Sequence, residues 1–137
     1  MNISSAITYP LTLNVQEPFI LLVDMHTERR RWVVSLLTFA HYHVRAVATP
    51  QEFFTWYLQH PMVPQAILIG QSSQQNLFFV QRFLQRMDTQ REKAIPVLLL
   101  VNYLPFTISL RNRTFNPNAA GCFALLEDLW RVVPRHD

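Results

Sequence analysis

The chain has 137 residues, of which 50% are hydrophobic and 15% charged, and its formal net charge is +3. This length and composition fit one globular domain with a sizeable core and exclude a disordered chain. The two glycines exclude a glycine-rich phosphate-binding loop, and the single cysteine, Cys122, excludes an internal disulfide and a multi-thiolate metal site. We therefore expect a reducing compartment, with the cytoplasm as the default.

Residues 1–17 form a polar lead-in to a predicted domain of residues 18–137. Leu11, Leu13 and Val15 alternate with polar residues, which leaves open either a short edge strand or a loose tail. The lead-in lacks the basic start and long apolar stretch of a signal peptide. No apolar run in the chain approaches the roughly 20 residues that span a bilayer, so we expect no membrane association.

Apolar runs predict the strands of a parallel sheet. Three of them are short and rich in branched residues, as is typical of strands covered on both faces. They span Phe19–Asp24, Gln65–Ile69 and Pro96–Asn102. A more polar run, His43–Ala48, predicts one further strand, and Gly121–Leu125 predicts a fifth.

Helices are predicted between these strands. Thr27 can cap the first, and Thr49–Glu52 is a capping box with proline at the first helical position of the second. Ser72 opens another capping box, whereas Tyr103–Asn118 supports at most a short helix. A last helix spans Leu126–Val133. Alternating strands and helices indicate right-handed crossovers and a three-layer α/β sandwich.

From about Phe19 to Val133 the chain resembles a response-regulator receiver domain, the flavodoxin-like module of phosphorelays. The resemblance rests on Ile20–Asp24, Pro64–Ile69 and Ala94–Leu100, and on the proline that opens the fourth strand. It implies a five-stranded parallel sheet whose functional residues follow the carboxyl ends of the strands.

The resemblance also implies that the phosphorylation chemistry has been lost. In receivers two adjacent acids after strand one hold Mg²⁺, an aspartate ending strand three accepts the phosphoryl group, and a serine or threonine ends strand four. Here Asp24 matches the first acid, while Met25, Gly70 and Val101 replace the others. The family's lysine after strand five is missing, because the one lysine, Lys93, precedes strand four. Mg²⁺ needs several oxygen ligands and an acyl phosphate needs a carboxylate, so we expect no metal, cofactor or enzyme activity.

Asp24 is expected to have become a structural group. Helix amides or His26 could balance its charge, and Asp24→Asn should then cost about 1 kcal/mol or less, the scale of one hydrogen bond.

We therefore expect a non-catalytic, receiver-like signalling module of a two-component or phosphorelay pathway that acts by protein–protein interaction. The alternative is a small-ligand sensor that uses the cleft above Asp24, Gly70 and Val101. Nucleic-acid binding through the arginines, which are eleven of the twelve basic residues, ranks third.

The region Tyr103–Val133 is the predicted interaction surface, because working receivers pair through the corresponding surface. It combines aromatic residues with arginines, the composition of interface cores and their anchors. The candidate residues are Tyr103, Phe106, Arg111, Arg113, Phe115, Trp130 and Arg131. We expect a constitutive homodimer, with another signalling protein as the alternative partner. If the segment is irregular instead, its aromatic residues pack into the core.

Overall fold

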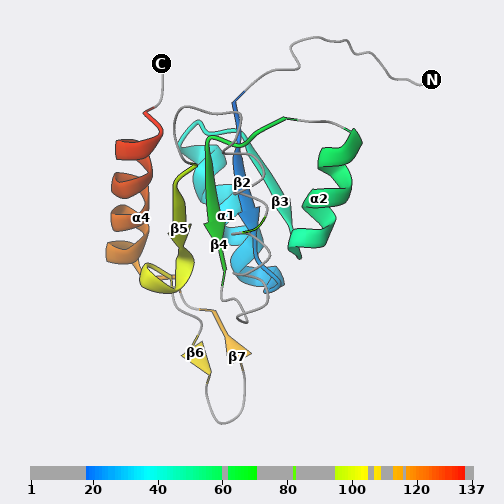
Figure 1. The fold of residues 1–137 in the computed structure, drawn as a ribbon. Coiled ribbons are helices and arrows are strands. Elements are labelled where there is room, and N and C mark those ends of the chain that lie inside the picture. The colour runs from blue at the N-terminus through cyan, green and yellow to red at the C-terminus, as the bar shows by residue number, and fades with distance from the viewer. Residues whose placement is uncertain are drawn as a thin grey trace, which may run out of the picture.

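The computed structural model describes residues 18–59, 62–70, 82, 95–104, 107–108, 113–115 and 117–134. These residues form an α/β domain with helices on both faces of a parallel sheet (Figure 1). The lead-in and the helix predicted after Ser72 lie outside the described residues. Within the described part of the chain, every helix is too short or too polar to cross a lipid bilayer.

The sheet contains four parallel strands in the described residues, in the order β3-β2-β4-β5. The strands are β2 (Ile20–Val23), β3 (Val44–Val47), β4 (Ala66–Ile69) and β5 (Val97–Leu99). All residues of the two central strands, β2 and β4, are buried. The apolar runs thus correctly predicted the strands that are covered on both faces.

The fifth strand predicted at Gly121–Leu125 is wrong, because these residues lie in helix α4 (Ala119–Val132). Asn118 caps this helix: its Oδ1 accepts a hydrogen bond from the N–H of Gly121 at 3.1 Å. Leu125 and Leu129 are fully buried at helical spacing. The short apolar run is therefore part of a longer pattern with a period of 3.6 residues.

The other two helices are α1 (Thr27–Phe39) and α2 (Pro50–Gln59). The cap of α1 is His26 and not Thr27, since Nδ1 of His26 accepts from the N–H of Arg29 at 3.2 Å. Helix α2 begins at the predicted capping box. The N–H of Glu52 donates to Oγ1 of Thr49 at 3.3 Å, and Glu52 Oε2 accepts from the N–H of Ala48 at 3.0 Å.

Alternate strand residues build one core on each face of the sheet. One face packs against α1 and α4 through Ile20, Leu22, Ala66, Leu68, Val33, Leu37, Leu125 and Leu129. The other packs against α2 through Leu21, Val23, Ile67, Ile69 and Phe53. Helices α1 and α4 are also joined at their ends, because the hydroxyl of Tyr42 donates to the carbonyl of Val133 at 2.9 Å.

Strand β5 continues into a 3-10 helix, η2 (Leu100–Asn102), and the chain then leaves the sheet. Two short strands follow, β6 (Thr107–Ile108) and β7 (Arg113–Thr114), which pair antiparallel and project beyond the sheet (Figure 1). The helix considered for Tyr103–Asn118 is thus replaced by a strand pair. Threonine and isoleucine favour extended backbone there, and prolines flank the pair.

Candidate functional site

The predicted pocket positions lie at the carboxyl edge of the sheet, but only two of them form a buried site. Asp24 follows β2 and Gly70 follows β4, and these neighbouring strands bring the two residues into contact. Both are buried, whereas Met25 and Val101 are exposed.

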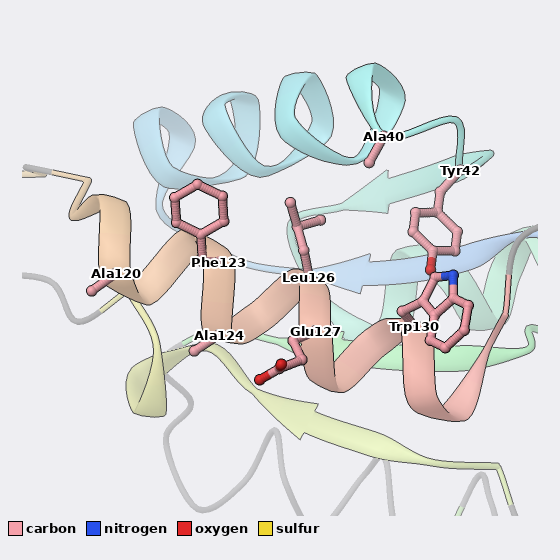
Figure 2. A pocket seen from close by; sticks show the side chains of 8 residues that line it. All are labelled: Ala40, Tyr42, Ala120, Phe123, Ala124, Leu126, Glu127 and Trp130. Carbon is pink, nitrogen blue, oxygen red and sulfur yellow. The ribbon is translucent and has the colours of Figure 1, made fainter.

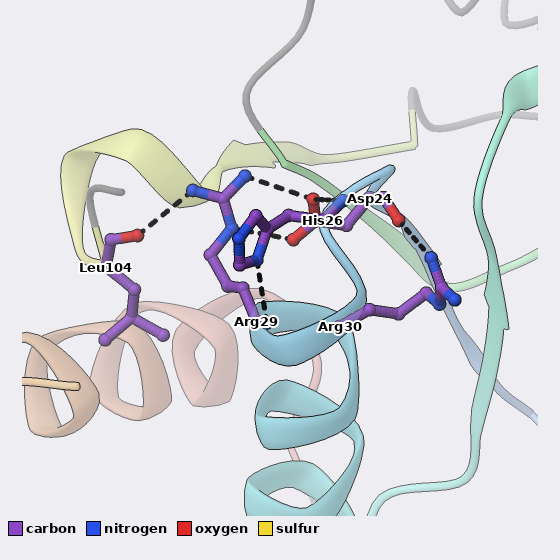
Figure 3. Close-up of polar contacts among 5 residues, drawn as sticks. All are labelled: Asp24, His26, Arg29, Arg30 and Leu104. Atoms are coloured by element: carbon purple, nitrogen blue, oxygen red, sulfur yellow. Dashed lines mark hydrogen bonds and ion pairs between the residues drawn. The ribbon is translucent and has the colours of Figure 1, made fainter. Parts of the chain in front are cut away.

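Arg29, in the first turn of α1, holds the carboxylate of Asp24 (Figure 3). Its Nε donates to Oδ2 at 2.7 Å and its Nη2 donates to Oδ1 at 3.1 Å. The third nitrogen, Nη1, donates to the carbonyl of Leu104 at 3.3 Å. Both charged side chains are 1% exposed. Two nitrogens of the planar guanidinium therefore bind one carboxylate, and the third nitrogen binds the segment after η2.

Backbone groups complete the network around Asp24. The N–H of His26 donates to Oδ1 at 2.9 Å, and the N–H of Asp24 itself donates to the carbonyl of Val47 at 3.0 Å. Nη1 of Arg30 donates to the Asp24 carbonyl at 2.8 Å. Asp24 thereby joins the ends of β2 and β3 to the start of α1.

Gly70 closes the site from the neighbouring strand. A Cβ placed on Gly70 would lie 2.8 Å from Cβ of Asp24 and would overlap its carboxyl group. The φ of Gly70 is not in the left-handed region, so the requirement for glycine is one of space and not of backbone conformation.

The residues at this site do not fit a magnesium ion. Mg²⁺ demands near-octahedral oxygen coordination, yet Asp24 supplies one carboxylate whose two oxygens already accept hydrogen bonds. The guanidinium of Arg29 lies against that carboxylate as its ion-pair partner and would repel a metal cation. In the described residues, no group of three histidine, cysteine or acidic side chains could hold a metal.

Sequence reasoning gave Asp24 a structural role and named helix amides or His26 as partners for its charge, but it missed the main partner. His26 does contribute its backbone N–H, while the ion pair is made by Arg29, which the sequence analysis did not consider. A signal was present: Arg29, Val33 and Leu37 share the i, i+4, i+8 spacing of the buried face of α1. A charged residue on that face needs a buried counter-charge, and Asp24 lies just before the helix.

The predicted interaction residues whose side chains the structure describes differ in exposure. Tyr103 and Phe115 are partly buried and pack against the core, while Trp130 and Arg131 are exposed on α4. Phe106 and Arg111 lie outside the described residues, and only the backbone of Arg113 is described, in β7.

Three contacts with acidic residues of α4 involve Tyr103 and Arg131. The hydroxyl of Tyr103 donates to Oδ2 of Asp128 at 2.7 Å. Burial, the hydrogen bond with Asp128 and the charge of Asp128 together raise the pKa of Tyr103 to about 12. Arg131 forms exposed ion pairs within α4, at 3.7 Å to Glu127 and 3.5 Å to Asp128. Such exposed pairs contribute little to stability.

Comparisons of the chain with protein-family models, with curated proteins and with solved structures returned no match. The buried ion pair of Asp24 and Arg29 is thus the feature from which a function can be inferred.

Proposed function

We propose that this protein is a non-catalytic, receiver-like signalling module of a two-component or phosphorelay pathway, and that it acts through protein–protein contacts without aspartyl phosphorylation. The observation that carries this proposal is the ion pair between Arg29 and Asp24. It lies where a receiver holds its metal ion and phosphoryl group. The strand order β3-β2-β4-β5 is compatible with the flavodoxin-like topology that the resemblance implies.

In the proposed module, the guanidinium of Arg29 supplies the positive charge that a metal ion supplies in a working receiver. A metal ion is exchanged with solvent, whereas the guanidinium of Arg29 is part of the chain. Through the carbonyl of Leu104 it also anchors the start of the region Tyr103–Val133. The corresponding region of working receivers is the surface that phosphorylation tunes. The module therefore presents one constant surface.

The small-ligand alternative is disfavoured by the same geometry. The predicted cleft lay above Asp24, Gly70 and Val101, yet the carboxylate of Asp24 fills the space beside Gly70. Asp24 and Arg29 are at most 2% exposed, which leaves no accessible polar group of this pair to orient a ligand.

Mass spectrometry of the intact chain after incubation with acetyl phosphate and Mg²⁺ tests the proposed function. We expect an unchanged mass, while a receiver domain with both acids and the acceptor aspartate gains one phosphoryl group under the same conditions. A stoichiometric, hydroxylamine-sensitive gain of one phosphoryl group by this chain would overturn the proposal.

A further inference from the structure

Four exposed aromatic side chains lie on the two helices that share one face of the sheet. Trp32 and Phe39 of α1 are 40% and 86% exposed, and Phe123 and Trp130 of α4 are 72% and 50% exposed. The members of each pair are seven residues apart, which corresponds to two turns and about 10.5 Å along the helix. The two helices therefore carry aromatic pairs of equal spacing.

The pairs also lie at matching levels, because α1 and α4 run in the same direction (Figure 1) and lie next to each other (Figure 2). The hydrogen bond from Tyr42 to Val133 joins the ends of the two helices. Near their starts, the rings of His26 and Phe115 lie 6.5 Å apart between centroids. Trp32 and Phe123 consequently belong to the starting turns, whereas Phe39 and Trp130 lie near the ends.

A hollow of about 610 Å³ opens beside the aromatic residues of α4 (Figure 2). Tyr42 and Ala40, which follow α1, line it together with Phe123, Ala124, Leu126 and Trp130 of α4. Phe39, the most exposed of the four aromatic residues, directly precedes Ala40. The most exposed aromatic residue is thus one position along the chain from a residue that lines the hollow.

We propose that this face, made by Trp32, Phe39, Phe123 and Trp130, binds a second copy of the chain in a symmetric dimer. A two-fold axis parallel to the helices places α1 of each copy against α4 of the other. Because the aromatic spacings are equal, Phe39 then packs against Trp130 of the second copy and Trp32 packs against Phe123. Each of these contacts occurs twice. The inference rests on the proposed interaction module and names its partner and its surface.

The exposed aromatic area supplies the larger part of a standard dimer interface. With about 200 Å² for a full aromatic side chain, the four exposed fractions give about 500 Å² for each copy. This is more than half of the roughly 800 Å² that each partner buries in a standard interface. An apolar patch of this size on a monomer is often a functional surface.

Charged side chains lie at the edge of this face, because Glu28 and Arg31 line a depression together with Trp32. Glu127, which also lines the hollow, has Arg131 of its own chain at 3.7 Å. Trp130 belongs both to the predicted interaction surface and to the proposed dimer face. The dimer face replaces the partly buried Tyr103 and Phe115 by exposed aromatic residues of α1 and α4.

Light scattering during size exclusion of the full chain tests this proposal at micromolar concentrations. We expect the wild type to be a dimer and Phe39→Glu and Phe123→Glu to be monomers. Leu58→Glu is the matched control, because Leu58 is an exposed apolar residue of α2 on the opposite face of the sheet, and it should remain a dimer. Circular dichroism confirms that each variant is folded.

A mixing experiment tests the expected pairing of Phe39 with Trp130. Phe39→Glu and Trp130→Lys should each be monomeric alone, and their mixture should form a heterodimer. In that heterodimer one contact is an ion pair and the other is the native aromatic pair. A mixture that remains monomeric would overturn this pairing.

A monomeric wild type, or a dimer that Phe39→Glu and Phe123→Glu leave intact, would overturn the proposed face. Neither result tests the proposal that the module acts without aspartyl phosphorylation. That proposal is overturned if the chain is phosphorylated.

Discussion

The carboxyl group of Asp24 occupies the space that a side chain at Gly70 would need. The position of the Asp24 carboxylate and the absence of a side chain at position 70 are therefore two aspects of one arrangement. Once Asp24 turns its carboxylate toward Arg29, with Nε and Oδ2 at 2.7 Å, a residue with a Cβ no longer fits on the neighbouring strand. The ion pair and the glycine depend on each other.

Gly70→Ala should destabilise the fold by about 1–3 kcal/mol, the usual cost of overpacking a well-filled interior. Urea denaturation of the wild type and the variant measures this difference. In an Asp24→Ala background the same substitution should cost less, since the carboxyl group is removed and only the contact between the two Cβ atoms, at 2.8 Å, remains. Equal costs in both backgrounds would show that Gly70 is not packed against Asp24.

Gly70→Asp should not restore phosphorylation. The new carboxylate would overlap that of Asp24, and the position of the second acid is still occupied by Met25. Intact-mass measurement with acetyl phosphate and Mg²⁺ checks this expectation, with circular dichroism as the control for folding. A folded variant that gains one phosphoryl group would contradict the account of the blocked site.

Asp24→Asn should cost about 3–5 kcal/mol of unfolding free energy, because it leaves the buried Arg29 without its counter-charge. This is larger than the value expected from the sequence, which assumed one hydrogen bond. Arg131→Gln is the control: its ion pairs are exposed, so a change of about 1 kcal/mol or less is expected. Chemical denaturation measures both, and equally small losses would contradict the structural role of the ion pair.

Replacing both charges should be milder than replacing one. Asp24→Leu combined with Arg29→Met removes the desolvation of two ions together with their attraction, and such exchanges are often close to neutral. We expect the double variant to be more stable than Asp24→Leu alone, as measured by the urea midpoint. A double variant less stable than either single one would contradict this coupling.

The hydrogen bond from Tyr103 to Asp128 predicts a loss of stability in strong base. The fold raises the pKa of Tyr103 from 10.0 to about 12, so it favours the neutral phenol. This contribution is fully present below pH 10 and disappears as the pH rises to about 12. The wild type should lose thermal stability over this interval more steeply than Tyr103→Phe, in which the other tyrosines are unchanged. Parallel pH profiles would contradict the assignment.

The sequence was sufficient for features that depend on local pattern. Strands β2 and β4 were predictable because apolar runs of this length are typical of buried strands, and Thr49–Glu52 identified the start of α2. Gly121–Leu125 was misassigned because five residues are too few to separate a strand from part of a helix. Only the longer spacing of Leu125, Leu129 and Val133 distinguishes them.

The arrangement around Arg29 could be predicted only in part. Its place on the buried face of α1 is a local property that the sequence contains. Its bond to the carbonyl of Leu104 joins positions 75 residues apart, and no local periodicity encodes such a contact. The overlap between Asp24 and Gly70 depends likewise on the pairing of β2 with β4.

Amide NMR spectra of the full chain, recorded with and without Mg²⁺ and beryllium fluoride, test most directly whether the site is permanently occupied by Arg29. Beryllium fluoride mimics a phosphoryl group on a carboxylate, and Mg²⁺ accompanies it. The account predicts that the amide signals of Asp24, Met25 and Gly70 do not move as these additives are titrated. Saturable shifts of these signals would show that the additives reach Asp24, and would contradict the proposal that Arg29 has replaced the metal ion.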